Sequence, residues 1–500
     1  MRTFQIRPYY LKKEDLRIPA LDGGDSEIGK LLENAYNEAL HVMFNVNCVN
    51  RNGKALFVAG GEYSDVWTRD GSYNSYAAGS FLAPHVTENT LRALLADGMV
   101  NGSIAGGSFD DLQFWDKQLW IIAAYRHWLI TRNSDFLQLA AGISIQTLAY
   151  QEEHYFVPEF SLFRGPGFFL DSIGALPMPY ARIVDGKSCV AEYPDAVKVM
   201  TLSTNSIYVQ AYRDAAAILD ALGRDASLAA QYREKADSLA EVIRNRFFRN
   251  SPNGIPAYFI HGTGPQKGEP AFFQEGSGLG FSLLFGIADE SLARNVFDQV
   301  HLEPNGLPVI WPNLKNDYLG SGKTGSTDSG YHTPQNITIW PQVNGIWMLG
   351  CAAFGKTELL GSELENFCRL IQENNGIWEI YHARTGNPKL WGHPAKKHQN
   401  WGAAALLSAV HHGIFGLTFT KEGFELHPNL PSGWGTLRLS GVRINGALLD
   451  ITLRGAGNRI ARCAMDGVPH ETSFSSIAGS HRIELELSDC PAPSFAKQSD

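Results

Sequence analysis

Helical segments joined alternately by very short links and very long loops are the feature of this sequence that most restricts its fold. Apolar residues recur at the spacing of a helix face from residue 27 to about residue 412. The periodicity predicts helices at 27–44, 71–82, 87–99, 112–131, 134–152, 200–221, 225–247, 275–285, 289–299, 339–354, 356–374 and 399–411. The short links between helices are "LAPH", "TR", "LGR", "GIA" and Gly355. Links of this length place successive helices antiparallel.

The loops between these helical hairpins are much longer. They lie at 45–70, 100–111, 153–199, 248–274, 300–338 and 375–398. Loops longer than about 15 residues usually have a function or are disordered, and the many Trp, Tyr, Gly and Pro residues here make a poor composition for disorder. Because every hairpin turns back at its short link, all of the long loops emerge at one end. The sequence therefore predicts a mainly α fold, an (α/α)6 toroid of six helical hairpins with one elaborated face. A helical array that does not close is the alternative.

The period of the hydrophobic pattern changes near residue 416. The stretch "LTFTKEGFELHPNLPSGWGTLRLSGVRINGALLDITLRGAG" alternates with period two and contains Gly, Pro and Asn-Gly turn signals, and "HRIELEL" continues the alternation. We expect a β-sandwich-like C-terminal cap. The predicted organisation is an N-terminal extension at 1–26, a barrel at 27–416, the β-rich cap at 417–490 and a tail at 491–500.

Composition limits the partners and the location of the chain. The formal net charge is −9 and no basic cluster is present, which argues against nucleic acid. No apolar stretch reaches the ~18 residues of a membrane span. The opening "MRTFQIRPYYLKKEDLR" has no apolar core of a signal peptide, so we expect a cytoplasmic protein, or an exported one whose leader was removed. The six cysteines show no paired spacing and are expected to be thiols, with one disulfide possible. The sequence leaves the oligomeric state open.

Each long loop brings aromatic side chains together with acids, amides or arginine to the same rim. This mixture suits a neutral carbohydrate, whose hydroxyls bind polar side chains and whose apolar faces stack on indoles. The candidate substrate-binding residues are Trp67, Arg69, Asp70, Asp111, Trp115, Arg164, Gln274, Glu275, His332, Gln335, Trp340, Trp391 and Trp401. A phosphate site would show a Gly-rich loop with Lys, and the sequence has none. His382, His393 and His398 lack the spacing of metal ligands. We therefore expect no metal and no cofactor.

Cleavage of a glycosidic bond needs two carboxyl groups, one to protonate the leaving oxygen and one to activate water or to attack. Asp171 lies between "GPGFFL" and "SIGALPMPY", an apolar neighbourhood that disfavours ionisation. Glu379 lies among Trp378, Ile380 and Tyr381. These two are the candidate catalytic residues, and Glu275 is the rival for the second role.

Structural roles are open for many of the same residues. Thr68 or Asp70 can cap the helix that follows, Asp171 can cap a turn within its loop, and Glu379 can brace the last loop. Similar alternatives are helix-start roles for Asp110, Asp111 and Glu275, core positions for Trp115, Trp120, Trp340 and Trp401, and a loop brace for Arg164.

Four short motifs resemble those of the six-hairpin glycosidases. They are "VWTRDGSY", "LDSIGALPMPY", "IWPQVNGIW" and "WEIYHARTG", each before an inner helix. The pattern is similar to glycoside hydrolase family sixty-three, of the α-glucosidase and mannosylglycerate hydrolase type. The resemblance implies that Asp171 is the general acid, that Glu379 is the base, and that Arg69 and Asp70 grip hydroxyls of the non-reducing sugar. The context "FFLDSIGALP" lacks the Glu-Ser-Gly that precedes the acid in that family.

The resemblance implies an inverting, exo-acting, α-glucosidase-like hydrolase of oligosaccharides or small glycosides that needs no cofactor. Other enzymes of this superfamily are alternatives: an α-L-rhamnosidase, a glycoside phosphorylase, or an epimerase that uses paired histidines. A terpene-type cyclase is suggested only weakly by "FDDLQFWD". A non-catalytic sugar-binding protein is the alternative outside enzymes.

Overall fold

Thirteen α-helical segments, some extended by a turn of π-helix, are the main elements of the described chain. The structure is a computed structural model that describes residues 5–8, 10–11, 16–177, 179–180, 189–249, 251–314, 336–389, 395–475 and 477–488, with the backbone of 326–327 and 330–331. The helices are α1 (Glu27–Leu40), α2 (Thr68–Asn74), α3 (Ser80–Leu82), α4 (Pro84–Ala93), α5 (Gln118–Thr131), α6 (Ser134–Tyr155), α7 (Leu202–Leu222), α8 (Ala226–Ile243), α9 (Gly276–Leu284), α10 (Glu290–Gln299), α11 (Pro341–Ala353), α12 (Thr357–Glu373) and α13 (Asn400–Ser408). Each predicted helix is present.

Two predicted boundaries were wrong by several residues. The helix expected at 87–99 ends at Ala93, because Asp97 and Gly98 both have positive φ and turn the chain into a β-hairpin. The helix expected from 112 begins at Gln118, after a 3₁₀ turn at Phe114–Asp116. In both places local turn geometry ends a pattern that helical spacing alone would have continued.

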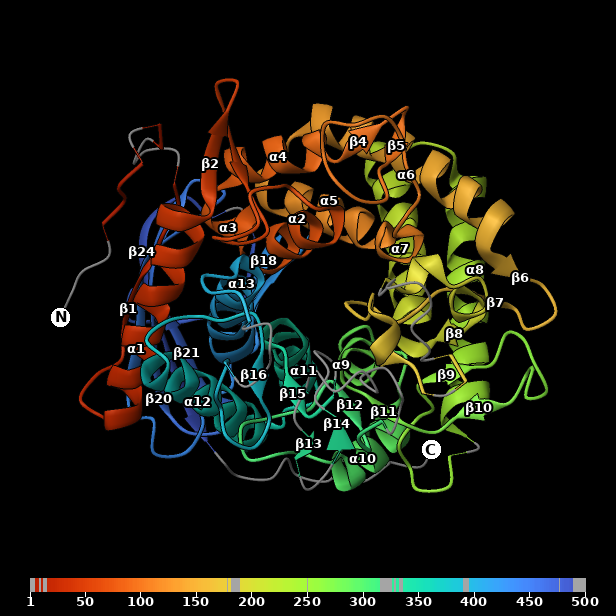
Figure 1. Cartoon of the computed structure of the whole chain (residues 1–500). Coiled ribbons are helices and arrows are strands. Elements are labelled where there is room, and N and C mark those ends of the chain that lie inside the picture. The colour runs from red at the N-terminus through yellow and green to blue at the C-terminus, as the bar shows by residue number, and fades with distance from the viewer. Residues whose placement is uncertain are drawn as a thin grey trace, which may run out of the picture.

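Contacts between the inner helices run in chain order. α2 contacts α5, α5 contacts α7, α7 contacts α9, α9 contacts α11, α11 contacts α13, and α13 contacts α2 again. Figure 1 shows these helices around the middle of the molecule, with α1, α4, α6, α8, α10 and α12 outside them. The inner helices are buried on nearly all sides, whereas α10 and α12 have an apolar face and a polar face.

Small residues set the close approach of inner helices. A Cβ atom on Gly280 of α9 would lie 2.7 Å from Ile346 Cγ2 and 2.9 Å from Trp347 N of α11. A Cβ atom on Gly345 would lie 2.6 Å from Ala405 Cβ of α13. The glycines therefore allow backbones to pack at a distance that larger side chains would prevent.

Two sheets follow the helices. The larger sheet has the order β1-β19-β20-β24-β21-β22, and the smaller has the order β17-β18-β23. Their strands are β1 (Ala20–Asp22), β17 (Leu417–Phe419), β18 (Gly423–Leu426), β19 (Leu437–Ile444), β20 (Ala447–Gly455), β21 (Arg459–Met465), β22 (Val468–Pro469), β23 (Ser473–Ser475) and β24 (Gly479–Ser488). Asn445 and Gly446, both with positive φ, turn β19 into β20 as the Asn-Gly signal predicts.

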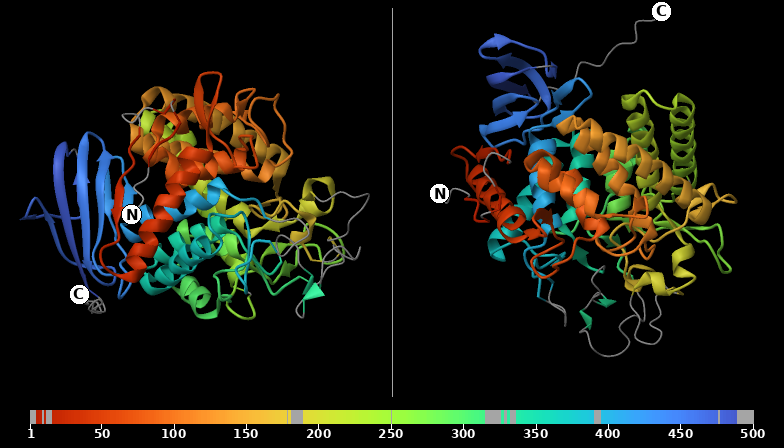
Figure 2. Two further views of the ribbon diagram at one scale, coloured as in Figure 1. Left: turned by 60° about the vertical axis from the view of Figure 1, so that its left-hand side comes forward. Right: turned by 90° about the horizontal axis from the view of Figure 1, so that it is seen from above.

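The N-terminal extension contributes to this β region, because β1 pairs antiparallel with β19. Figure 2 shows the larger sheet on the side of the helices opposite to the long loops. β17 contacts α5 and the π-helical turn Ala409–Ile414, and Thr357 Oγ1 at the start of α12 donates to Asn429 Oδ1 at 3.1 Å. The β region therefore packs against the ends of the helices that lie away from the long loops.

The remaining strands are short and lie in the loops. They are β2 (Cys48–Arg51), β3 (Lys54–Phe57), β4 (Leu95–Ala96), β5 (Met99–Val100), β6 (Phe156–Val157), β7 (Leu162–Phe163), β8 (Met200–Thr201), β9 (Phe259–Ile260), β10 (Pro270–Ala271), β11 (Gln274–Glu275), β12 (Ile310–Trp311), β13 (Ser326–Thr327), β14 (Gly330–Tyr331), β15 (Thr338–Ile339) and β16 (Tyr381–His382). Within the described residues, no helix combines the length and apolar character that crossing a membrane requires. Cys48, Cys189, Cys351, Cys368 and Cys463 are free thiols.

Candidate functional site

Arg69 is the centre of a buried cluster of charges at the start of α2. Its Nη1 lies 3.2 Å from Asp171 Oδ2 and 3.7 Å from Asp116 Oδ2, and its Nε lies 3.7 Å from Asp70 Oδ2. α2 has Trp67 at its N-cap position and no side-chain capping bond. Thr68 Oγ1 is buried without a hydrogen-bond partner among the described residues, whereas the Asp70 carboxylate accepts from its own backbone N–H in the first turn of α2. That turn therefore holds a backbone contact of Asp70 as well as the charge cluster.

One guanidinium balances three carboxyl groups here. Burial would lower the pKa of Arg69, but Asp171, Asp116 and Asp70 together hold that pKa above its ordinary value. Burial raises the pKa of Asp70 to about 6, although Arg69 opposes the shift. Burial also raises the pKa of Asp116 well above its ordinary value. Burial therefore raises the pKa of both Asp70 and Asp116, and the positive charge of Arg69 opposes the shift in each.

Asp171 is the most accessible acid of the cluster, with 29% of its side chain exposed. Its Oδ2 accepts hydrogen bonds from Arg69 and, at 3.3 Å, from Gln113 Nε2. It does not cap the neighbouring 3₁₀ turn at Ile173–Ala175, because Ser172 is that cap. The carboxylate is thus held by side chains from two other segments while one side stays open.

The backbone before Asp171 is held in an unusual conformation. Phe169 has a φ of +63°, which side chains larger than glycine rarely adopt. Its ring lies 4.9 Å from the Arg69 guanidinium and 4.9 Å from the Trp401 ring, edge to face. Trp401 in turn stacks on Trp340 with centroids 5.8 Å apart. Trp340 and Trp401 are almost fully buried and form the aromatic support behind Arg69 and Phe169.

Glu379 lies in the last long loop and faces the first one. Its Oε1 accepts a hydrogen bond from Tyr63 OH at 3.2 Å, and its Oε2 accepts one from Lys396 N at 3.1 Å. Burial raises the pKa of Glu379 to about 7; these two hydrogen bonds oppose the shift, and the charges of Asp70 and Asp171 add to it. Because the charges of Asp70 and Asp171 act on Glu379, the structure places it in the same electrostatic environment as the Arg69 cluster.

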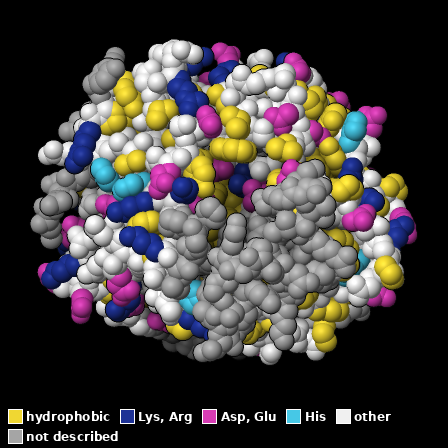
Figure 3. All heavy atoms as spheres, viewed as in Figure 1, with side chains coloured by type: hydrophobic (Ala, Val, Ile, Leu, Met, Phe, Trp, Pro, Cys, Tyr) yellow, Lys and Arg dark blue, Asp and Glu magenta, His cyan; other side chains and the backbone are white. Residues whose placement is uncertain are grey.

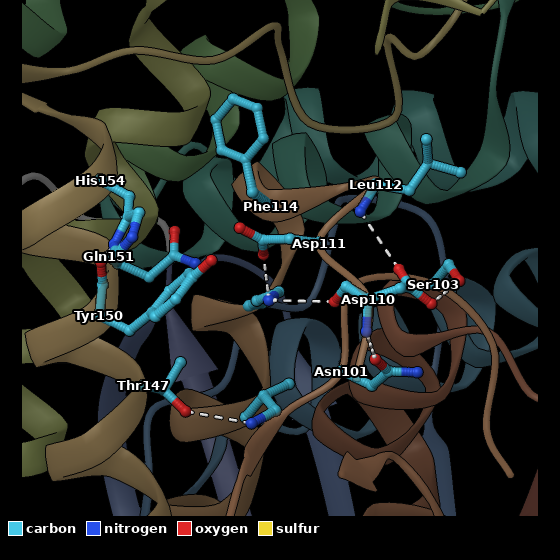
Figure 4. A network of polar contacts seen from close by, with 12 residues as sticks. Asn101, Ser103, Asp110, Asp111, Leu112, Phe114, Thr147, Tyr150, Gln151 and His154 are labelled. Atoms are coloured by element: carbon cyan, nitrogen blue, oxygen red, sulfur yellow. Dashed lines mark hydrogen bonds and ion pairs between the residues drawn. The ribbon is translucent and has the colours of Figure 1, made fainter. Parts of the chain in front are cut away.

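Asp111 belongs to a different network (Figure 4). It accepts hydrogen bonds from Lys117 Nζ and Tyr155 OH. The adjacent Asp110 accepts from Ser103 Oγ at 2.6 Å and from Leu112 N at 3.1 Å. Neither residue caps α5, whose N-cap is Lys117. The acid of this segment that reaches Arg69 is Asp116, five residues further on.

Glu275 is fully buried at the N-cap of α9. Its carboxylate accepts from Ser203 N at 3.1 Å, from Ser203 Oγ and from Ser277 Oγ at 3.2 Å. Burial raises its pKa to about 8. Gln274 binds the backbone of His301 with both ends of its amide, at 2.8 and 3.0 Å. These contacts join Glu275 to α7 and α9 and join Gln274 to a loop.

The other predicted site residues lie in different surroundings, some in the core and some in the loops. Trp115 has no exposed surface and packs in the core, so the structure corrects its assignment to sugar binding. Arg164 lies over the Tyr155 ring at 4.9 Å and donates to His154 O at 3.4 Å, which is the loop brace allowed above. Trp67 stays partly exposed. His332, Gln335 and Trp391 lie outside the described residues.

The described residues contain no cluster of three or more His, Cys, Asp or Glu side chains placed to hold a metal. Of the three histidines in the last loop, His382 accepts from Arg384 N and Thr385 N and so stabilises a turn. His393 lies outside the described residues.

Tyr63, Gln113 and Asp116 are parts of the site that sequence reasoning did not assign. Each lies within or beside a stretch that attracted attention for other residues, "YSDVWTRD" and "FDDLQFWD". Tyr63 could have been assigned to the site because it is close in sequence to Arg69, which was predicted to bind substrate. For Asp116 the sequence offers no such signal, because its contact with Arg69 depends on how α5 packs beside α2. On the loop-bearing face, Figure 3 shows hydrophobic, acidic and basic side chains mixed around the middle of the view.

The fold of this chain is shared with known glycoside hydrolases. A Bacillus sp. GL1 rhamnosidase of family GH78 matches with a TM-score of 0.60 and 14% identity, over 94% of this chain and 44% of that one. A protein described as a sialidase matches with a TM-score of 0.62 and 14% identity, over 86% of this chain and 38% of that one. The GH63 mannosylglycerate hydrolase of Thermus thermophilus matches with a TM-score of 0.54 and 16% identity, over 75% of this chain and all of that one.

This chain spans less than half the length of the sialidase and of the rhamnosidase. No family model and no curated sequence matches it. At these identities the likeness establishes a common fold, and the predicted resemblance to six-hairpin glycosidases is confirmed at that level.

Proposed function

We propose that this chain is a glycoside hydrolase with an (α/α)6 toroid, whose catalytic carboxyl groups are Asp171 and Glu379. The return of the inner-helix contacts from α13 to α2 supports a closed toroid. The glycoside hydrolases that share its fold support the reaction class. The observation that carries the proposal is the arrangement of two acids from loops 208 positions apart in sequence (379 − 171) around Arg69 and Tyr63.

In the mechanism we propose, Asp171 protonates the glycosidic oxygen and Glu379 removes a proton from water on the opposite face of the sugar. Arg69 and Asp70 bind hydroxyls of the terminal sugar, and the aromatic residues behind them keep the site rigid. An inverting reaction of this kind requires carboxyl groups about 6.5–9.5 Å apart, so that one water fits between base and sugar. The product is expected to have the inverted anomeric configuration.

The electrostatics also support a version in which the two roles are exchanged. Arg69 donates a hydrogen bond to Asp171, whose side chain is 29% exposed, so a water molecule can reach this carboxyl group. Because the pKa of Glu379 is about 7, about half of the molecules carry a proton on this side chain at pH 7, which is the form that an acid needs. Both versions use the same two carboxyl groups. Substrates that differ in their leaving group distinguish one version from the other.

Two variants test the pair. Asp171→Asn and Glu379→Gln should each lower kcat for an unactivated glycoside by about 100- to 10,000-fold, the usual contribution of a positioned proton donor or acceptor. Glu363→Gln of α12 is the matched control, because it changes another buried acid whose pKa burial raises to about 7 and whose carboxylate accepts from Leu307 N and Asn344 Nδ2, and it should retain far more turnover. Near wild-type kcat in either of the first two variants would rule out the pair.

A substrate with a good leaving group separates the roles. A dinitrophenyl glycoside needs no protonation, so the variant that lacks the acid should hydrolyse it at close to the wild-type rate. The variant that lacks the base should stay inactive on every glycoside. Recovery in Asp171→Asn supports the first version, and recovery in Glu379→Gln supports the exchanged version. Product configuration, followed by NMR, tests inversion in the same reactions.

The sugar is the finer part of the proposal. The α-glucosidase-like preference follows the family resemblance, while the rhamnosidase match over 94% of this chain supports an α-L-rhamnoside as the second candidate. Aryl α-glucosides and aryl α-L-rhamnosides assayed side by side decide between them. An increase in turnover on adding inorganic phosphate would instead indicate a phosphorylase.

A further inference from the structure

A second cavity lies at the opposite end of the inner helices from Asp171 and Glu379. Its volume is about 740 Å³, and it is a partly open cavity between α5, α7, α9 and α11 on one side and the β region on the other. Ligand sites commonly have volumes of about 300–1,000 Å³. None of its lining residues belongs to the Arg69 cluster or to the Glu379 loop. Figure 2 shows the β region on this side, away from the long loops.

Arg126 of α5 lines this cavity and contributes a positive charge to it. Its guanidinium lies 4.6 Å from the centre of the Tyr76 ring, and its Nε is buried without a hydrogen-bond partner among the described residues. Tyr76 hydrogen-bonds the guanidinium, and Asp214 of the same cavity attracts it without forming an ion pair within 4.0 Å among the described residues. Arg126 is partly exposed in the cavity, and its buried Nε has no hydrogen-bond partner among the described residues, so the guanidinium keeps donor capacity for a bound anion.

The other polar groups of the cavity donate or accept hydrogen bonds without adding clear negative charge. Asp214 of α7 accepts from Gln210 Nε2 at 2.9 Å, and burial raises the pKa of Asp214 to about 8 against the opposing effect of Gln210 and two arginines. His412 lines the same space, with its Nε2 buried and unpartnered among the described residues. Asn458 of the β region lines the other side.

We propose that this cavity binds a small hydroxylated molecule that carries one anionic group, a carboxylate or a phosphate. Arg126 binds the anionic oxygens, since a guanidinium offers two parallel donors to such a group. Gln210, Asp214, His412 and Asn458 bind its hydroxyls. The bound molecule also bridges the helices and the β region, so its binding stabilises the whole chain.

Three probes of one carbon skeleton test the charge requirement on the full chain. Gluconate carries a carboxylate, sorbitol 6-phosphate carries a phosphate, and sorbitol is the neutral equivalent. Isothermal titration should show binding of at least one anion about tenfold tighter than sorbitol, one tenfold step in Kd being about 1.4 kcal/mol. The same anion should raise Tm. The better of the two anions identifies the preferred group.

Substitutions in the cavity test whether the anion binds there. Arg126→Gln should weaken binding of that anion about tenfold or more. Arg224→Gln removes an exposed arginine between α7 and α8 and should leave the affinity unchanged. Asn458→Asp adds a negative charge from the β side and should weaken binding by repulsion, which gives a second test if Arg126→Gln does not fold. Equal affinity for sorbitol, no binding of any probe, or anion binding unchanged by both cavity variants would overturn the proposal.

Discussion

At the scale of single residues, Tyr63 lowers the pKa of Glu379 through one hydrogen bond. A hydrogen bond from Tyr63 OH to Glu379 Oε1 stabilises the carboxylate and so lowers its pKa, against the larger effect of burial. Nothing in the composition of the first loop indicates this contact, because the two residues are 316 positions apart. The tyrosine is therefore a positioning residue that only the folded chain reveals.

Tyr63→Phe should move the titration of Glu379 to higher pH. Loss of the hydrogen bond destabilises the carboxylate, so the pKa of Glu379 should rise above its value of about 7. A profile of kcat/KM against pH measures this as an upward shift of the limb that Glu379 controls. Tyr232→Phe, on outer helix α8, is the control and should leave the profile unchanged. A limb that moves to lower pH would contradict the role given to Tyr63.

At the scale of elements, the helical pairs were predictable because each obeys a local rule. Spacing of apolar residues locates the helices, and short turns fix their antiparallel order. The predicted helix boundaries were wrong where α4 ends at Ala93 and where α5 begins at Gln118, because backbone turns set these boundaries. Amino-acid composition also distinguishes inner helices from outer ones, since inner helices such as α9 and α13 are rich in Gly, Ala and Ser.

Gly280 and Gly142 form a matched pair that tests close packing between inner helices. Gly280→Ala places a Cβ 2.7 Å from Ile346 Cγ2, and overpacking of this kind should cost about 1–3 kcal/mol. Gly142 lies on the exposed side of α6, and no atom lies within 4 Å of the position that a Cβ would occupy there. Gly142→Ala should therefore stabilise the chain by about 0.5–1 kcal/mol through helix propensity. Urea unfolding measures both values. Equal effects in the two variants would argue against tight packing of α9 on α11.

At the scale of the whole molecule, several buried acids bind protons more tightly in the folded chain than in the unfolded one. Burial raises the pKa of Glu275 and Asp214 to about 8 and that of Glu363 and Glu379 to about 7, from ordinary values near 4. Between pH 6.5 and 8.5 the native state therefore holds more protons than the unfolded state, and the free energy of unfolding falls as pH rises.

The chain should consequently be more stable at pH 6.5 than at pH 8.5. Urea unfolding at the two values measures the difference. Glu275→Gln should reduce that difference, because the amide cannot ionise at the higher pH. Below pH 6.5 the buried histidines His127, His411 and His412, whose pKa values burial lowers, bind protons preferentially in the unfolded state and oppose the trend. Greater stability at pH 8.5 would show that the buried acids are not the controlling groups.

The sequence by itself determined the helices, the Asn-Gly turn in the β region, and the loops that carry Arg69, Asp171 and Glu379. These features depend on neighbours in the chain, through side-chain periodicity and turn chemistry. Tertiary structure alone decided that Asp116 rather than Asp111 contacts Arg69, that Ser172 rather than Asp171 caps its turn, and that Trp115 is buried. It also decided the cavity around Arg126. Such contacts join segments far apart in sequence, and their distances follow from how helices pack, which no local pattern records.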